Sequence, residues 1–119
     1  EGRKNMILVI GGYAAGKKEY VRSLGYQEED FTTDPQEEKP VVYGLETLAA
    51  QAGEGWESLV PGLVEKEVVI CQEVGSGVIP LEKEARQMRE YTGRLCTALA
   101  EQADRVVRLF CGIPTIIKE

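Results

Sequence analysis

Three mostly apolar runs recur along the chain, and the first of them is apolar at every position. They cover residues 6–10, 68–72 and 106–110 and are rich in β-favouring side chains. Runs without polar alternation are typical of strands that are buried on both faces, as in a parallel sheet. Between the last two runs, apolar or small residues recur at intervals of three or four over residues 81–103, which predicts a long helix. Strands that alternate with helices predict an α/β domain with a mostly parallel sheet.

The remaining elements are less regular. Residues 27–40 carry many charges and no apolar period, so we expect an exposed loop there. The other expected elements are helices at 16–24, 46–51 and 56–65, a short strand at 41–45, a turn at 112–114 and an edge strand at 115–118. Pro61 should limit the length of the third of these helices.

Length and charge limit the domain count and the partners. The chain has 119 residues, which suits one domain. We assign that domain to residues 6–119 and treat residues 1–5 as an extension or a cloning remnant. With 14 basic against 20 acidic residues, the net charge is −6. An acidic chain gains nothing from counterion release, so nucleic acid and anionic membranes are poor partners. A bound nucleotide would need a local site that opposes the negative electrostatic field of the whole protein.

Histidine is absent, which excludes histidine-based acid–base catalysis and histidine metal sites, and we predict no metal site. The three cysteines, Cys71, Cys96 and Cys111, stand far apart in apolar stretches, so we interpret them as unpaired, buried hydrophobes. An odd, unpaired set suits a reducing compartment. No apolar run is long enough to span a bilayer or to form the core of a signal peptide. These features predict a cytoplasmic protein.

A phosphate-binding motif follows the first apolar run. Residues 11–17 read GGYAAGK and fit the pattern G-x-x-x-x-G-K. Glycines let backbone N–H groups approach phosphate oxygens, the helix start behind them adds partial positive charge, and Lys17 would reach the terminal phosphates as a catalytic cation. The candidate nucleotide-binding residues are Gly11, Gly12, Ala14, Ala15, Gly16, Lys17 and Lys18. The alternative is an ordinary corner between a strand and a helix.

Lys18 departs from a working loop of this kind. The position normally carries Ser or Thr, whose hydroxyl ligates Mg²⁺. An ammonium group cannot coordinate a cation and would repel one. Lys18 is therefore either a solvent-facing lysine of the first helical turn, or part of a loop that holds phosphate without metal or no longer holds nucleotide. The expected ligand is GTP or ATP, and the sequence argues against Mg²⁺ as its companion.

Two stretches of the sequence carry a resemblance to a known family. The opening reads MILVIGGYAAGK, and residues 73–95 read EVGSGVIPLEKEARQMREYTGRL. Both are similar to motifs of the adenosylcobinamide kinase/guanylyltransferase family of cobalamin (corrinoid) biosynthesis. The resemblance covers the beginning of the chain and residues 68–119. It implies a RecA-like P-loop domain in three layers, phosphorylation and guanylylation of a corrinoid, and a homo-oligomer, often a trimer.

The middle of the chain departs from this family. The family transfers the GMP group through a histidine, which this chain lacks, so guanylyl transfer by that route is excluded. The resemblance also puts Tyr43 where a metal-directed carboxylate is expected, although Glu46 could stand in for it. Two hypotheses remain open: a residual NTP-dependent cobinamide kinase that uses Lys17, or a non-catalytic relative that binds a nucleotide or corrinoid or serves as a partner subunit.

Further candidates follow the second apolar run. Glu73 ends a predicted strand at the carboxyl edge of the sheet, where ligands bind in α/β folds. We interpret it as a second catalytic residue that contacts substrate or metal, or else as a loop carboxylate bonded to the neighbouring glycines. Gly75 and Gly77 should permit a tight turn beside the ligand cleft. Arg86 and Arg89 would contact a phosphate or a neighbouring subunit, or form surface pairs with nearby glutamates.

Overall fold

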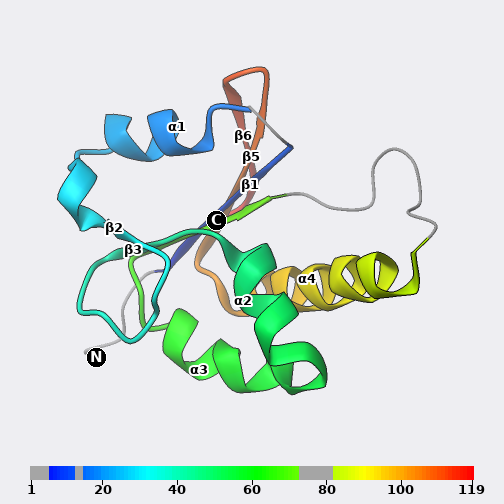
Figure 1. Ribbon diagram of the computed structural model, residues 1–119. Helices are drawn as coiled ribbons and strands as arrows, with labels where there is room; N and C mark the ends of the chain where they lie inside the picture. The colour runs from blue at the N-terminus through cyan, green and yellow to red at the C-terminus, as the bar shows by residue number, and fades with distance from the viewer. Residues whose placement is uncertain (1–5, 13–14, 73–81) are drawn as a thin grey trace.

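A computed structural model describes residues 6–12, 15–72 and 82–119 of the chain (Figure 1). Within them the strands form a six-stranded sheet in the order β2-β3-β4-β1-β5-β6. Neighbouring strands are parallel except β5 and β6, which are antiparallel. The strands are β1 (Ile7–Gly11), β2 (Phe31–Thr32), β3 (Val41–Val42), β4 (Val68–Gln72), β5 (Arg105–Phe110) and β6 (Ile113–Lys118). The prediction of an α/β domain with a mostly parallel sheet is confirmed.

Helices cover both faces of the sheet. The described helices are α1 (Lys17–Ser23), α2 (Leu45–Ala52), α3 (Val60–Leu63) and α4 (Lys83–Gln102), with the 3₁₀ helices η1 (Glu28–Asp30) and η2 (Gly53–Leu59). Figure 1 shows α1 on one side of the sheet and α2, α3 and α4 on the other, which gives three layers. Among the described helices, none combines the length and the apolar character needed to cross a membrane.

Successive residues of the central strand belong to different halves of the core. Leu8 packs with Val69 and Leu99 in the cluster under α2, α3 and α4. Its neighbour Val9 packs with Val21 in the cluster under α1. All of these side chains are almost fully buried. Burial on both faces explains why the run of residues 6–10, which contains most of β1, is apolar at every position rather than at alternate ones.

Residues 27–40 are mostly exposed, as we expected, but they are not a loop throughout. They include η1 and β2, and both residues of β2, Phe31 and Thr32, are buried. Polar groups around this strand bond inward: the Thr32 hydroxyl donates to the Glu37 carboxylate and accepts a hydrogen bond from the Asp34 N–H at 3.0 Å. The charges of this segment therefore belong to turns that close around a short, buried strand.

The helix expected at residues 56–65 is divided into η2 and α3. Pro61 lies in the first turn of α3, where its missing N–H removes no helical hydrogen bond. It therefore helps to begin this helix and does not limit its length. The strand expected at 41–45 is shorter, because Gly44 takes a left-handed conformation (φ 77°) at the start of α2. The edge strand expected at 115–118 begins earlier, at Ile113.

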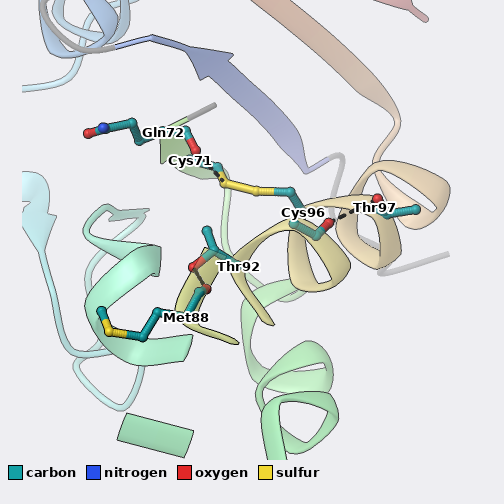
Figure 2. Close-up of a disulfide and its surroundings, with 7 residues drawn as sticks. Cys71, Gln72, Met88, Thr92, Cys96 and Thr97 are labelled. Atoms are coloured by element: carbon teal, nitrogen blue, oxygen red, sulfur yellow. Dashed lines mark hydrogen bonds between the residues drawn. A yellow bond between two sulfur atoms is a disulfide. The ribbon is translucent and has the colours of Figure 1, made fainter. Parts of the chain in front are cut away.

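The prediction of three unpaired, buried cysteines is wrong. Cys71 of β4 and Cys96 of α4 form a disulfide (Figure 2), and Cys111 is an exposed free cysteine in the turn between β5 and β6. The two bonded cysteines are 25 residues apart, and only the return of α4 over β4 brings them together. Sequence spacing gives no sign of that return. The argument from unpaired cysteines to a reducing compartment therefore fails.

Candidate functional site

Two glycines of the loop after β1 are required by its backbone. Gly16 has a φ of 87°, in the left-handed region that favours glycine. A side chain at Gly11 would be tightly packed, because a Cβ there would lie 3.1 Å from the Leu109 carbonyl oxygen and 3.2 Å from the Ala15 Cβ. The Ala15 carbonyl accepts a hydrogen bond of 3.0 Å from the N–H of Gly112, in the turn between β5 and β6. Gly11 and Gly16 are thus the two restrained positions on either side of this loop, and Ala15 is bonded to the neighbouring strand turn.

Lys17 begins α1, and its side chain turns back over this loop. Its Nζ donates a hydrogen bond of 2.7 Å to the carbonyl oxygen of Gly12. The same carbonyl accepts the N–H of Ala15 at 3.2 Å. Partial burial lowers the pKa of Lys17, and the negative charge of Glu46 on α2 offsets part of that effect. The loop therefore holds one ammonium group, with an acidic side chain in the same site.

A cavity of about 500 Å³ lies beside Lys17. It is formed by the start of α1, the start of α2 and the carboxyl ends of strands, which is where open α/β sheets bind ligands. Its volume is within the range of small-molecule sites, roughly 300–1,000 Å³. The polar side chains that line it are Lys17, Lys18, Glu19, Thr33, Tyr43, Glu46, Thr47 and Gln72.

Lys18 lies in the wall of this cavity and is half-buried. Its Nζ is 3.8 Å from the centroid of the Tyr43 ring, which is a cation–π contact. Tyr43 follows β3, and its N–H donates to the Thr32 carbonyl at 3.0 Å. The Tyr43 ring also meets the Phe31 ring edge-on, with 6.4 Å between centroids. Lys18 is therefore not the fully solvent-facing lysine that one of our two interpretations required.

The carboxyl end of β4 reaches the same cavity. Gln72, the last residue of β4, lines it and is the register partner of Gly11 in β1. The predicted residues Ala14, Glu73, Gly75 and Gly77 lie outside the described residues.

The two predicted arginines lie on α4, on the opposite side of the sheet from α1 (Figure 1). Arg89 is half-buried and lines a separate groove between η2 and α4, together with Trp56. Arg86 is exposed. Neither of them lines the cavity at Lys17. The structure therefore does not bring these arginines together with the candidate phosphate loop.

Four polar residues of the cavity were missed from the sequence: Glu19, Thr33, Thr47 and Gln72. Thr33 directly follows β2, and Thr47 lies in the first turn of α2. Both follow the carboxyl end of a parallel strand, Thr33 directly and Thr47 at the start of the next helix, which is the signal that would have found them. For Thr33 the signal was hidden because β2 contains only two residues. The strand before Thr47 was expected at 41–45, but the helix start that follows it was not recognised as part of a ligand site.

Comparison with known proteins identifies a family. Residues 34–117 match the model of the family described as cobinamide kinase / cobinamide phosphate guanyltransferase. The matched region begins after the loop at residues 11–18, so the loop has to be judged on its geometry. None of the curated proteins matches the sequence. Because the family model covers most of the chain, the protein belongs to the cobinamide kinase / cobinamide phosphate guanyltransferase family.

Proposed function

We propose that this protein is a cobinamide-kinase-like nucleotide-binding protein of cobalamin biosynthesis, and that the loop at residues 11–18 is a P-loop that binds GTP or ATP. Family membership supports the pathway. One observation supports a nucleotide as the ligand. The Lys17 ammonium is held at the Gly12 carbonyl, beside a cavity of about 500 Å³. A corrinoid is the second substrate that the family suggests.

Phosphate fits this site on charge and on hydrogen bonding. An ammonium group has three donors, so Lys17 can keep its bond to Gly12 and still bind an incoming phosphate oxygen. Bonds between charged partners are roughly twice as strong as neutral ones. Lys18 adds a second positive charge in the same cavity. The carboxylates of Glu19 and Glu46 line the same cavity and balance this charge, so the attraction for a nucleotide has to come from the Lys17 ammonium at the loop rather than from a net positive lining.

The residues of the loop do not fit Mg²⁺. A P-loop normally offers Mg²⁺ the hydroxyl that follows its lysine. Here that residue is Lys18, whose ammonium is occupied with the Tyr43 ring and would repel a cation. We therefore propose that the nucleotide binds without metal, and we derive no catalytic step through Mg²⁺.

A non-catalytic role is the second candidate function, and the contact between Lys18 and Tyr43 favours it. Phosphoryl transfer depends on positioning and on neutralising the charge that develops on the phosphoryl oxygens. Removing one electrostatic element of this kind commonly costs about two to three orders of magnitude in rate. The chain also contains no histidine to carry a GMP group. The protein would then bind a nucleotide or a corrinoid, or serve as a partner subunit, without efficient turnover.

Isothermal titration calorimetry with GTP and ATP, each with and without Mg²⁺, tests this proposal. We expect micromolar binding that does not depend on Mg²⁺. Lys17→Ala should weaken it about 10- to 100-fold, because it removes a hydrogen bond between charged groups. Lys83→Ala is the matched control, since Lys83 is exposed on α4 and lies outside the cavity. Binding that requires Mg²⁺ would argue for the active kinase, and affinity unchanged in Lys17→Ala would put the nucleotide elsewhere.

A further inference from the structure

The Cys71–Cys96 disulfide joins a strand to the helix that covers it. Cys71 is fully buried in β4, and Cys96 is half-buried in α4 (Figure 2). Their Cα atoms are 6.7 Å apart. Disulfides commonly span Cα separations of about 4.4–6.8 Å, so the bond can open and close without moving the backbone.

The bonded cysteine is next to the wall of the cavity. Gln72 follows Cys71, lines the cavity and is the register partner of Gly11 in the candidate phosphate loop. Cys71 itself is paired with Ile10, the residue before that glycine. The Cys71 Sγ lies 3.6 Å from the Gln72 carbonyl oxygen, as Figure 2 shows. A change at this sulfur therefore acts on the strand end that forms one side of the ligand site.

Other contacts hold α4 on the sheet independently of the disulfide. Leu95 and Leu99 are fully buried in the core cluster under α2, α3 and α4. At the end of α4, Lys118 Nζ donates hydrogen bonds of 3.0 Å to the carbonyl oxygens of Ala100 and Glu101. Opening the disulfide would leave these contacts in place. Within the folded state its effect should therefore be centred on the carboxyl end of β4.

We propose that the Cys71–Cys96 disulfide is a reversible redox control of the cavity at Lys17. The oxidised form fixes the carboxyl end of β4 against α4 and favours ligand binding, and the reduced form releases this strand end and weakens binding. The ligand itself rests on the proposed function. A dithiol supplies the two electrons: the protein S–S bond breaks, each sulfur takes up one electron and one proton, and the dithiol becomes a disulfide. The Cys71 thiol then has the Gln72 carbonyl as an acceptor for its weak S–H donor.

The test compares the oxidised protein with the protein reduced by dithiothreitol, both in a Cys111→Ser background. This substitution removes the exposed thiol, which would otherwise exchange with the disulfide. Hydrogen exchange reports on the strands, and calorimetry with GTP reports on the cavity. In the reduced form we expect exchange in β4 to accelerate about tenfold or more beyond any acceleration seen in β5. GTP affinity should fall at least about fivefold, the lower end of typical coupling between sites.

A second variant separates the redox effect from loss of structure. The double substitution Cys71→Ala/Cys96→Ala should behave like the reduced protein under oxidising conditions. Equal exchange in the oxidised and reduced forms would overturn the proposal, and so would acceleration spread evenly over β1, β4 and β5, because that means global destabilisation. If neither form binds GTP, the proposed function fails, whereas the exchange contrast between β4 and β5 still decides the redox proposal.

Discussion

The Lys18 ammonium lies 3.8 Å from the centroid of the Tyr43 ring. By the family resemblance, these two positions should carry a magnesium-binding hydroxyl and a metal-directed carboxylate. Instead, a cation lies over an aromatic ring there, and the two attract each other electrostatically. The two departures from the family pattern are therefore one local change, because both residues line the same cavity. This pair is the physical reason to propose phosphate binding without metal.

Restoring both metal-directed groups should make binding magnesium-dependent. In the double variant Lys18→Ser/Tyr43→Asp, a hydroxyl and a carboxylate replace the cation–π pair, so Mg²⁺ can bridge the loop and the phosphates. We expect Mg²⁺ to tighten GTP binding about tenfold or more in this variant and to leave the original protein unaffected. Calorimetry with and without Mg²⁺ measures the difference.

The single variants are the controls for this restoration. Lys18→Ser and Tyr43→Asp should each respond to Mg²⁺ less than the double variant, since each supplies one of the two groups. If Mg²⁺ already tightens binding in the unsubstituted protein, the cation–π pair does not block metal. If the double variant also ignores Mg²⁺, these are not the metal-directed positions.

Substitutions at the loop glycines should destabilise the fold. Gly16→Ala puts a side chain at a left-handed φ, which costs about 1 to 2 kcal/mol. Gly11→Ala creates a Cβ contact of 3.1 Å with the Leu109 carbonyl, and overpacking of this kind costs about 1 to 3 kcal/mol. Urea denaturation measures both losses in the free energy of unfolding. Gly55→Ala is the matched control: its φ is −86° and a Cβ there meets nothing within 4 Å, so stability should be unchanged or slightly higher.

As pH rises, nucleotide affinity should be lost at a lower pH than it would be if Lys17 had the usual pKa of a lysine. Burial lowers the pKa of Lys17 from its usual 10.5, so the ammonium is lost at a lower pH. Affinity that depends on the charged form is fully present at neutral pH and lost as pH rises through the lowered pKa. Between the folded and unfolded pKa values, the unfolded state binds more protons, so the contribution of Lys17 to stability rises with pH there.

Glu46→Gln tests the origin of this pH profile. The Glu46 charge raises the pKa of Lys17, so its removal should move the loss of affinity to lower pH. Calorimetry from neutral pH to 10.5 follows the loss of affinity. Lys17→Arg is the control, because guanidinium stays charged throughout and should flatten the profile. A profile that is the same in all three proteins would show that Lys17 does not carry the binding.

Reduction of the disulfide should lower stability as well as affinity. Cys71 and Cys96 are 25 residues apart, and closing a loop of that size stabilises a fold by about 3 to 4 kcal/mol through the entropy of the unfolded chain. Urea denaturation of the oxidised and reduced forms of Cys111→Ser measures this difference. An unchanged midpoint would mean that the bond contributes nothing to the fold.

The sequence was sufficient where burial is complete and local geometry is strict. The strands β1 and β4 are visible as apolar runs because both of their faces are covered, whereas β5 leaves Arg108 and Phe110 exposed. Gly11 and Gly16 are recognisable because a side chain would be tightly packed at one and would need a positive φ at the other. Lys17 follows from the same motif, and the structure puts its ammonium on the loop.

The sequence was insufficient where the contact depends on how layers are stacked. The strand β2 has two residues, too few for a period to appear, and it was taken for part of a loop. The disulfide needs α4 to return over β4, and the contact of Lys18 with Tyr43 needs α1 and β3 to meet at one cavity. These relationships arise from the strand order, which local propensity does not encode.

A crystal structure with a non-hydrolysable GTP analogue, grown without divalent metal, tests the central claim most directly. We predict that the terminal phosphates occupy the cavity within hydrogen-bonding distance of the Lys17 Nζ, with the Lys18 ammonium on the same side. An analogue bound elsewhere on the molecule, with Lys17 still held only by the Gly12 carbonyl, would contradict the assignment of this loop as a phosphate site.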